Sequence, residues 1–136
     1  MKLILLFSAV GMMALVAGAA GLAADKTKSE EAFDRLASLK GEWEGQQDGV
    51  KISLIYTLTA NGSALMEEFR PESGPVMVTM FTVDGDHLIA THYCSAKNQP
   101  QMITAAITDA QQPLAFLLAR ITGLKSPDAG TIPALP

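Results

Sequence analysis

The sequence predicts a mainly β protein in which one short helix precedes about seven antiparallel strands, arranged as a sandwich or an up-and-down barrel. The clearest observation is residues 50–59, where apolar and polar side chains alternate with the period of a half-buried strand. Turn dipeptides, Asp48-Gly49 and Asn61-Gly62, flank this segment and are typical of tight hairpins. Short strands at this spacing are typical of all-β folds.

The N-terminal segment predicts export. Residues 3–24 carry no charged side chain and follow Lys2, which is the layout of a secretory signal. The small residues Gly21 and Ala23 predict cleavage after Ala23, which makes residues 1–23 a signal peptide and the product periplasmic or secreted. An uncleaved anchor is the alternative, because such a segment could span a bilayer. The small residues in its second half favour cleavage.

Removal of the signal from the 136 residues leaves enough chain for one domain. This product carries nine basic and fourteen acidic side chains, a net charge of −5, which argues against nucleic acid as a partner. Cys94 is the only cysteine, so no intrachain disulfide forms and no lipid anchor is attached near the cleavage point. We therefore expect no stable membrane insertion after cleavage; the composition leaves the oligomeric state open.

The predicted elements begin after a flexible polar segment, residues 24–29. Ser29 is a candidate N-cap, and apolar residues at helical spacing with a stop at Gly41 predict a helix over 30–40. The alternating segments and the turns between them predict seven strands, which occupy residues 41–46, 50–59, 64–70, 76–83, 87–95, 101–108 and 114–122. Residues 124–136 contain three prolines and predict an irregular tail.

A helix followed by Gly41-Glu42-Trp43 and a run of hairpins resembles the calycin superfamily, whose lipocalin members carry Gly-x-Trp at that place. The chain is also similar to a bacterial family of small exported, lipocalin-like proteins of unknown function. The similar stretches are Leu39 to Gly45, Gly62 to Leu65, Met77 to Thr79, Asp84 to Asp86, Thr91 to Pro100 and Leu124 to Asp128.

This resemblance implies a lipocalin-like β-barrel over residues 30–123, with the ring of Trp43 sealing the core at the closed end. Family members continue after the Ser126-Pro127-Asp128 loop with several strands that close the barrel, whereas residues 124–136 are unlike that continuation. We therefore expect an incomplete barrel with unpaired first and last strands. A truncated or frame-shifted reading frame, and hence a non-functional fragment, is one interpretation.

Strand parity limits the metal and haem hypotheses. His87 and His92 are five residues apart, so on one strand they face opposite sides. His92 and Cys94 share a face and could bind one soft metal, or His92 could ligate haem iron, as in haem-binding barrels to which calycins are similar. We favour the simpler interpretation that both side chains line an interior.

The sequence does not predict a set of catalytic residues that act together. Glu67 and Glu68 are adjacent and face opposite sides, and His92 lies beside Cys94 instead of facing it. Glu67 is equally well explained as an inward group that orients a ligand or as a paired interior charge. The chain is thus not predicted to be an enzyme.

The function expected from these features is the binding of a small apolar or amphipathic ligand, without a cofactor other than the haem alternative. The strand face that bears Ile52, Leu54, Tyr56 and Leu58 would line the interior, and methionines would make its wall adaptable. The predicted ligand-binding residues are Tyr56, Glu67, Met80, His92 and Cys94, with Trp43 structural.

Overall fold

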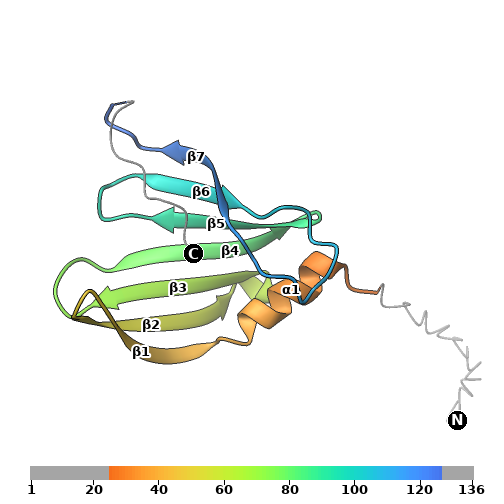
Figure 1. Cartoon of the computed structure of the whole chain (residues 1–136), viewed down its shortest axis with the longest axis horizontal. Helices are drawn as coiled ribbons and strands as arrows, with labels where there is room; N and C mark the ends of the chain where they lie inside the picture. The colour runs from red at the N-terminus through yellow and green to blue at the C-terminus, as the bar shows by residue number, and fades with distance from the viewer. Residues whose placement is uncertain (1–24, 127–136) are drawn as a thin grey trace, which may run out of the picture.

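The computed structural model describes residues 25–126, which form one helix and one antiparallel sheet (Figure 1). The elements are α1 (Lys28–Ala37), β1 (Gly41–Gln47), β2 (Val50–Thr59), a 3-10 turn (Ala60–Gly62), β3 (Ala64–Pro71), β4 (Met77–Asp84), β5 (His87–Tyr93), β6 (Gln99–Ile103) and β7 (Leu117–Thr122). The predicted signal peptide, its cleavage point at Ala23 and residues 127–136 lie outside the described residues. Within residues 25–126, no helix has the length and apolar character needed to cross a membrane.

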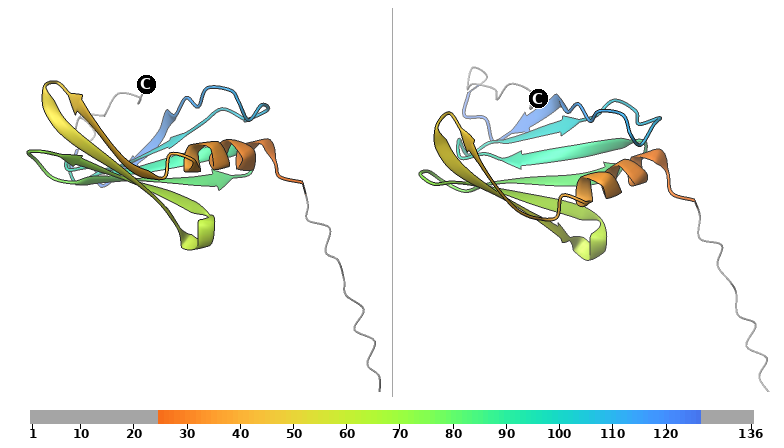
Figure 2. Two further views of the ribbon diagram at one scale, coloured as in Figure 1. Left: turned by 90° about the horizontal axis from the view of Figure 1, so that it is seen from below. Right: turned by 60° about the horizontal axis from the view of Figure 1, so that its bottom comes forward.

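The seven strands form a single sheet in chain order, β1 to β7, and each strand pairs with its neighbour in the sequence. Within residues 25–126, β1 and β7 are the two edges of this sheet and do not pair with each other. Figure 2 shows the sheet curled into a trough, with α1 lying inside the curve near one end of the strands. The mainly β, up-and-down prediction is therefore confirmed as an unclosed sheet, and the sandwich alternative is wrong for this part of the chain.

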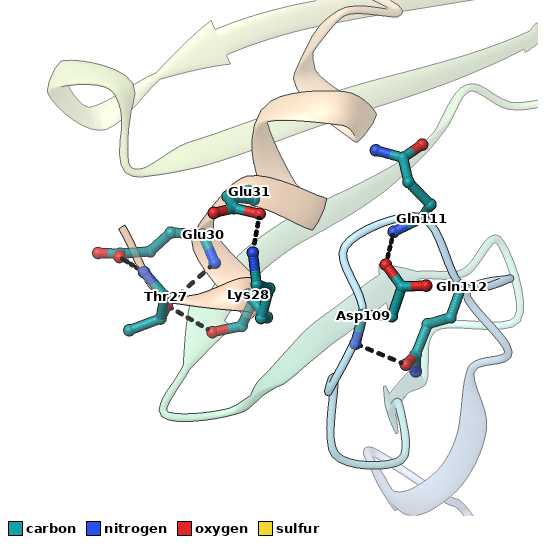
Figure 3. Close-up of polar contacts among 8 residues, drawn as sticks. Thr27, Lys28, Glu30, Glu31, Asp109, Gln111 and Gln112 are labelled. Atoms are coloured by element: carbon teal, nitrogen blue, oxygen red, sulfur yellow. Dashed lines mark hydrogen bonds and ion pairs between the residues drawn. The ribbon is translucent and has the colours of Figure 1, made fainter. Parts of the chain in front are cut away.

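Helix α1 begins two residues earlier than predicted because its N-cap is Thr27, not Ser29. The Thr27 hydroxyl accepts from the Glu30 backbone N–H, and the Glu30 carboxylate accepts from the Thr27 backbone N–H, which completes a capping box (Figure 3). Ser29 is instead buried and donates to the Gly85 carbonyl at 2.6 Å. Its hydroxyl thus ties the helix to the β4–β5 turn.

The segment between β6 and β7 differs from the prediction of a strand over 101–108. The backbone leaves the ladder at Thr104, whose N–H donates to the Leu88 carbonyl and whose hydroxyl accepts from the Leu88 N–H. The chain then runs beside α1, where Arg35 donates to the Gln112 carbonyl at 2.7 Å. A turn held by the Asp109 and Gln112 side chains shapes this segment (Figure 3). It therefore covers the helix instead of extending the sheet.

The core lies between α1 and the concave side of the sheet. Ala32 and Phe33 of α1 meet buried side chains of β3 to β6, and the β6–β7 segment closes the cluster from the other side. The buried members of this cluster are Ala32, Phe33, Leu65, Phe81, Leu88, Ala90, Met102, Ile107 and Phe116. All of them lie toward one end of the trough, so the helix covers only part of the concave face.

Trp43 does not seal the core. Its side chain is 51% exposed, and all seven residues of β1 are exposed. The reason is that β1 is an edge strand, so within residues 25–126 no further strand covers its outer side. The indole Nε1 donates to the Leu39 carbonyl at 2.7 Å, which fixes the ring beside the end of α1.

The position of the core predicts opposite results for two identical leucine truncations. Leu65→Ala removes a side chain with 0% exposure and should lower the free energy of unfolding by about 2–5 kcal/mol, because it leaves a cavity. Leu117→Ala, at a side chain that is 60% exposed, should change it by less than about 0.5 kcal/mol. Urea unfolding followed by circular dichroism measures both; equal losses would show that the core is elsewhere.

Candidate functional site

Four polar side chains form a row across the concave face. The strand registers place Tyr56 (β2) opposite Glu67 (β3), Glu67 opposite Thr79 (β4), and Thr79 opposite His92 (β5). Directly opposed residues of antiparallel strands share a face, so all four side chains lie on the side of the sheet that packs against α1. We call Tyr56, Glu67, Thr79 and His92 the polar row.

Hydrogen bonds connect every neighbour in the polar row. The Tyr56 hydroxyl donates to Glu67 Oε2 at 2.5 Å, and the Thr79 hydroxyl donates to Glu67 Oε1 at 3.3 Å. Thr79 Oγ1 also lies 3.0 Å from His92 Nδ1. Both oxygens of Glu67 act as acceptors, which is the pattern of an ionised carboxylate. The row is a continuous network that fixes the position of each member.

Partial burial shifts the pKa values of His92 and Tyr56, the two end members of the row. Burial lowers the pKa of the His92 imidazole below its ordinary value, and the nearby Glu67 carboxylate only partly opposes this effect. Burial, and then the hydrogen bond to Glu67, raise the pKa of the Tyr56 phenol. At neutral pH the row therefore holds a neutral imidazole and a neutral phenol on either side of one carboxylate.

Apolar residues flank the polar row on both sides. Two residues further along each strand, toward the open end of the trough, the register aligns an open apolar row of Trp43, Leu54, Phe69 and Met77. Two residues in the other direction, toward α1, it aligns a buried apolar row of Leu65, Phe81, Ala90 and Met102. The polar row thus lies between a surface that the helix covers and one that it leaves uncovered.

Three of the predicted ligand-binding residues, Tyr56, Glu67 and His92, belong to the polar row. Met80 does not, because it lies opposite Met66 and is adjacent in sequence to Thr79, so its side chain is on the convex face. A strand with period two cannot bring Met80 to the same face as Thr79. The structure therefore separates the predicted methionine from the predicted polar groups.

Cys94 follows the last residue of β5 and begins a turn. Its carbonyl accepts from the Lys97 N–H, its N–H donates to the Asn98 carbonyl, and its Sγ accepts from the Ala96 N–H at 3.5 Å. Within residues 25–126, no hydrogen bond joins Cys94 to His92 or to another member of the polar row. The Cys94 sulfur thus accepts a hydrogen bond within its own turn.

His87 lies in a separate environment, as strand parity predicts. Its Nδ1 is 2.8 Å from the Thr104 carbonyl oxygen and its Nε2 is 2.9 Å from Asp86. In the part of the chain that the structure describes, no three His, Cys, Asp or Glu side chains are grouped closely enough to hold a metal ion.

Thr79 is the member of the row that sequence reasoning missed. It is 1% exposed and bridges Glu67 to His92. The alternation of residues along β4 could have identified it. Met77, Thr79 and Phe81 share one face of this strand, and Thr79 is the single polar residue among them. A buried threonine in such a position needs hydrogen-bond partners, which the facing strands supply.

A hollow among the described residues lies apart from the polar row. It has a volume of about 650 Å³ and lies at the β1–β2 hairpin, where its lining includes Ile52, Arg70 and Pro71. This hollow is open, and polar and apolar atoms contribute similar shares of its lining. The polar row is the better candidate because it joins interacting groups that lie beside uncovered apolar surface.

Comparison of the chain with known protein families, with curated proteins and with solved structures found no match. Function is therefore inferred from the geometry of the polar row and of the apolar rows beside it.

The lowered pKa of His92 predicts a pH-dependent stability. Below the ordinary value of 6.5 the unfolded imidazole binds a proton that the folded state resists, so the free energy of unfolding should fall as the pH is lowered through 6.5. The loss stops growing once folded His92 is itself protonated. His92→Gln should show a smaller decrease between pH 7 and pH 5 in urea unfolding. Equal decreases would show that burial does not perturb His92.

Proposed function

We propose that this chain is an exported, lipocalin-like protein that binds a small apolar or amphipathic molecule on the concave face of its sheet. The observation that carries the proposal is the polar row lying between two apolar rows. A ligand with a polar end and an apolar body matches this order, with its polar end on the row and its body along Leu54, Phe69 and Met77.

Apolar burial would supply most of the binding free energy. Covering about 300 Å² of apolar surface is worth about 7 kcal/mol before the cost of association is subtracted. The open apolar row offers such surface, since Trp43 is 51% exposed and its neighbours are half-buried. The polar row would add orientation, because its hydrogen-bonding groups are held in place before the ligand arrives.

The lipocalin-like character of the fold belongs to the same proposal. Its support is the helix followed by antiparallel strands in chain order, the curl of the sheet, and the Gly41-Glu42-Trp43 stretch at the start of β1. In this proposal the trough corresponds to part of a barrel wall, with the ligand on the side that becomes the interior.

Export with cleavage after Ala23 is a further part of the proposal. Its support is the uncharged segment 3–24 behind Lys2. Every helix and strand of the described residues begins after this point, and the capping residue Thr27 stays with the product. An N-terminal sequence starting at Ala24 on the protein recovered outside the cytoplasm would support this cleavage; an intact residue 1 would contradict it.

A second candidate function is haem binding through His92. Its Nδ1 is hydrogen-bonded to Thr79, while within residues 25–126 its Nε2 forms no hydrogen bond, which is the arrangement that a metal-ligating histidine uses. Haem added to the protein should then give a Soret band that is sharper than that of free haem and shifted from it, and His92→Phe should remove both changes. A spectrum identical to that of free haem would contradict this candidate.

Two neighbouring substitutions test ligand binding on the concave face. Leu54 and Ile55 are both half-buried, but Leu54 lies on the concave face and Ile55 on the convex face. Leu54→Asn should weaken binding of the uncharged dye N-phenyl-1-naphthylamine about tenfold, which corresponds to about 1.4 kcal/mol of lost apolar contact. Ile55→Asn should leave it unchanged. Dye fluorescence measures both affinities, and equal effects or no binding to folded protein would contradict the proposal.

A further inference from the structure

Every polar hydrogen of the row is donated to another member of the row. A carboxylate can only accept, so the hydrogen bonds to Glu67 use the hydroxyl hydrogens of Tyr56 and Thr79. Thr79 has a single hydroxyl hydrogen, so its oxygen must accept in the contact with His92. The His92 Nδ1 is therefore the donor.

This assignment fixes the tautomer of His92. A neutral imidazole carries one N–H, and placing it on Nδ1 leaves Nε2 with a lone pair and no hydrogen. Within residues 25–126, Nε2 forms no hydrogen bond. The lone pairs that remain on Glu67, on the Tyr56 oxygen and on His92 Nε2 make the row an acceptor toward any incoming molecule.

Glu67 also lacks a positive partner in the part of the chain that the structure describes. The basic side chains with ion pairs bind other carboxylates, as Arg70 does with Glu68 on the convex face. Arg35 donates to a backbone carbonyl, and Arg120 donates to Gln101. A half-buried carboxylate beside apolar surface is stabilised by a cation, and here the neutral phenol and neutral imidazole do not supply one.

We propose that the ligand of this site carries a protonated amine on an apolar body, and that the ammonium group donates hydrogen bonds to the Glu67 carboxylate. This inference rests on the proposed function, that the concave face binds an amphipathic molecule. An ammonium brings up to three donors and a positive charge, which complements the free acceptors and the single negative charge of the row. A fatty acid anion brings neither, and an alcohol brings one donor without charge.

A matched panel of ligands tests the charge and donor preference on the unmodified protein. Dodecylamine, dodecanol and dodecanoate share one apolar chain, and all are used at neutral pH below the concentrations at which they form micelles. Calorimetry should show dodecylamine binding at least about tenfold more tightly than dodecanoate, with dodecanol between them. Equal affinities, or a preference for dodecanoate, would overturn the inference while leaving the proposed function standing. No binding of any of the three would overturn both.

Adjacent glutamates provide a matched pair of variants. Glu67→Gln and Glu68→Gln make the same chemical change at neighbouring positions on opposite faces of β3. Glu67→Gln should weaken dodecylamine binding about tenfold or more and leave dodecanol within about twofold, whereas Glu68→Gln should leave both unchanged. Equal losses in the two variants would show that the amine is held by overall charge and would overturn the inference.

The tautomer of His92 can be measured without any ligand. In ¹⁵N nuclear magnetic resonance at neutral pH, the Nδ1 of His92 should have the shift of a protonated ring nitrogen and Nε2 that of an unprotonated one. His92→Phe assigns the signals. The opposite tautomer would place a donor at Nε2 and would overturn the acceptor character on which the inference depends.

Discussion

The packing of α1 against one end of the concave face is the contact on which the rest of the structure depends. An open sheet has two faces and two edges, and only a covered face can form a core. Ala32 and Phe33 supply that cover together with Phe116 of the β6–β7 segment. A helix of ten residues is shorter than the trough. Helix α1 therefore does not cover the part of the concave face that lies beyond the polar row. The same contact therefore defines both the core and the uncovered surface beside it.

The sequence predicted most of the sheet, because the strands depend on local patterns. The alternation over residues 50–59 and the turns at Asp48-Gly49 and Asn61-Gly62 are short-range signals, and β2 has the predicted bounds. The start of β6 was missed because Pro100 indicated a loop. Pro100 precedes Gln101, where the ladder with β5 begins, so its missing N–H interrupts no bond of that pair. The residue preferences of this segment could not show that Pro100 lies just outside the ladder with β5.

The elements that failed are those decided by distant contacts. Ser29 and Thr27 are both good N-caps by residue type, and the choice depends on Gly85, which binds the Ser29 hydroxyl from the β4–β5 turn. Residues 104–108 have strand-like composition but turn away to cover α1. Trp43 was expected to seal the core at the closed end of the barrel, but it lies on an edge strand and is 51% exposed. In each case the tertiary arrangement, and not the local sequence pattern, decided the outcome.

The candidate site also depends partly on local pattern and partly on tertiary contacts. Alternation along a strand assigns residues to a face, whereas the register between strands decides which residues meet. Alternation along β3 places Glu67 on the same face as Leu65 and Phe69. Only the pairing of four strands brings the members of the polar row together, which are Tyr56, Glu67, Thr79 and His92. A one-residue slip of β4 would replace Thr79 by Met80 or Val78 and leave both Glu67 and His92 without their shared partner. The register of β4 therefore decides the hydrogen bonding of the row. The single hydroxyl hydrogen of Thr79 is donated to the Glu67 carboxylate, and its oxygen accepts from His92 Nδ1, which leaves Nε2 as an acceptor.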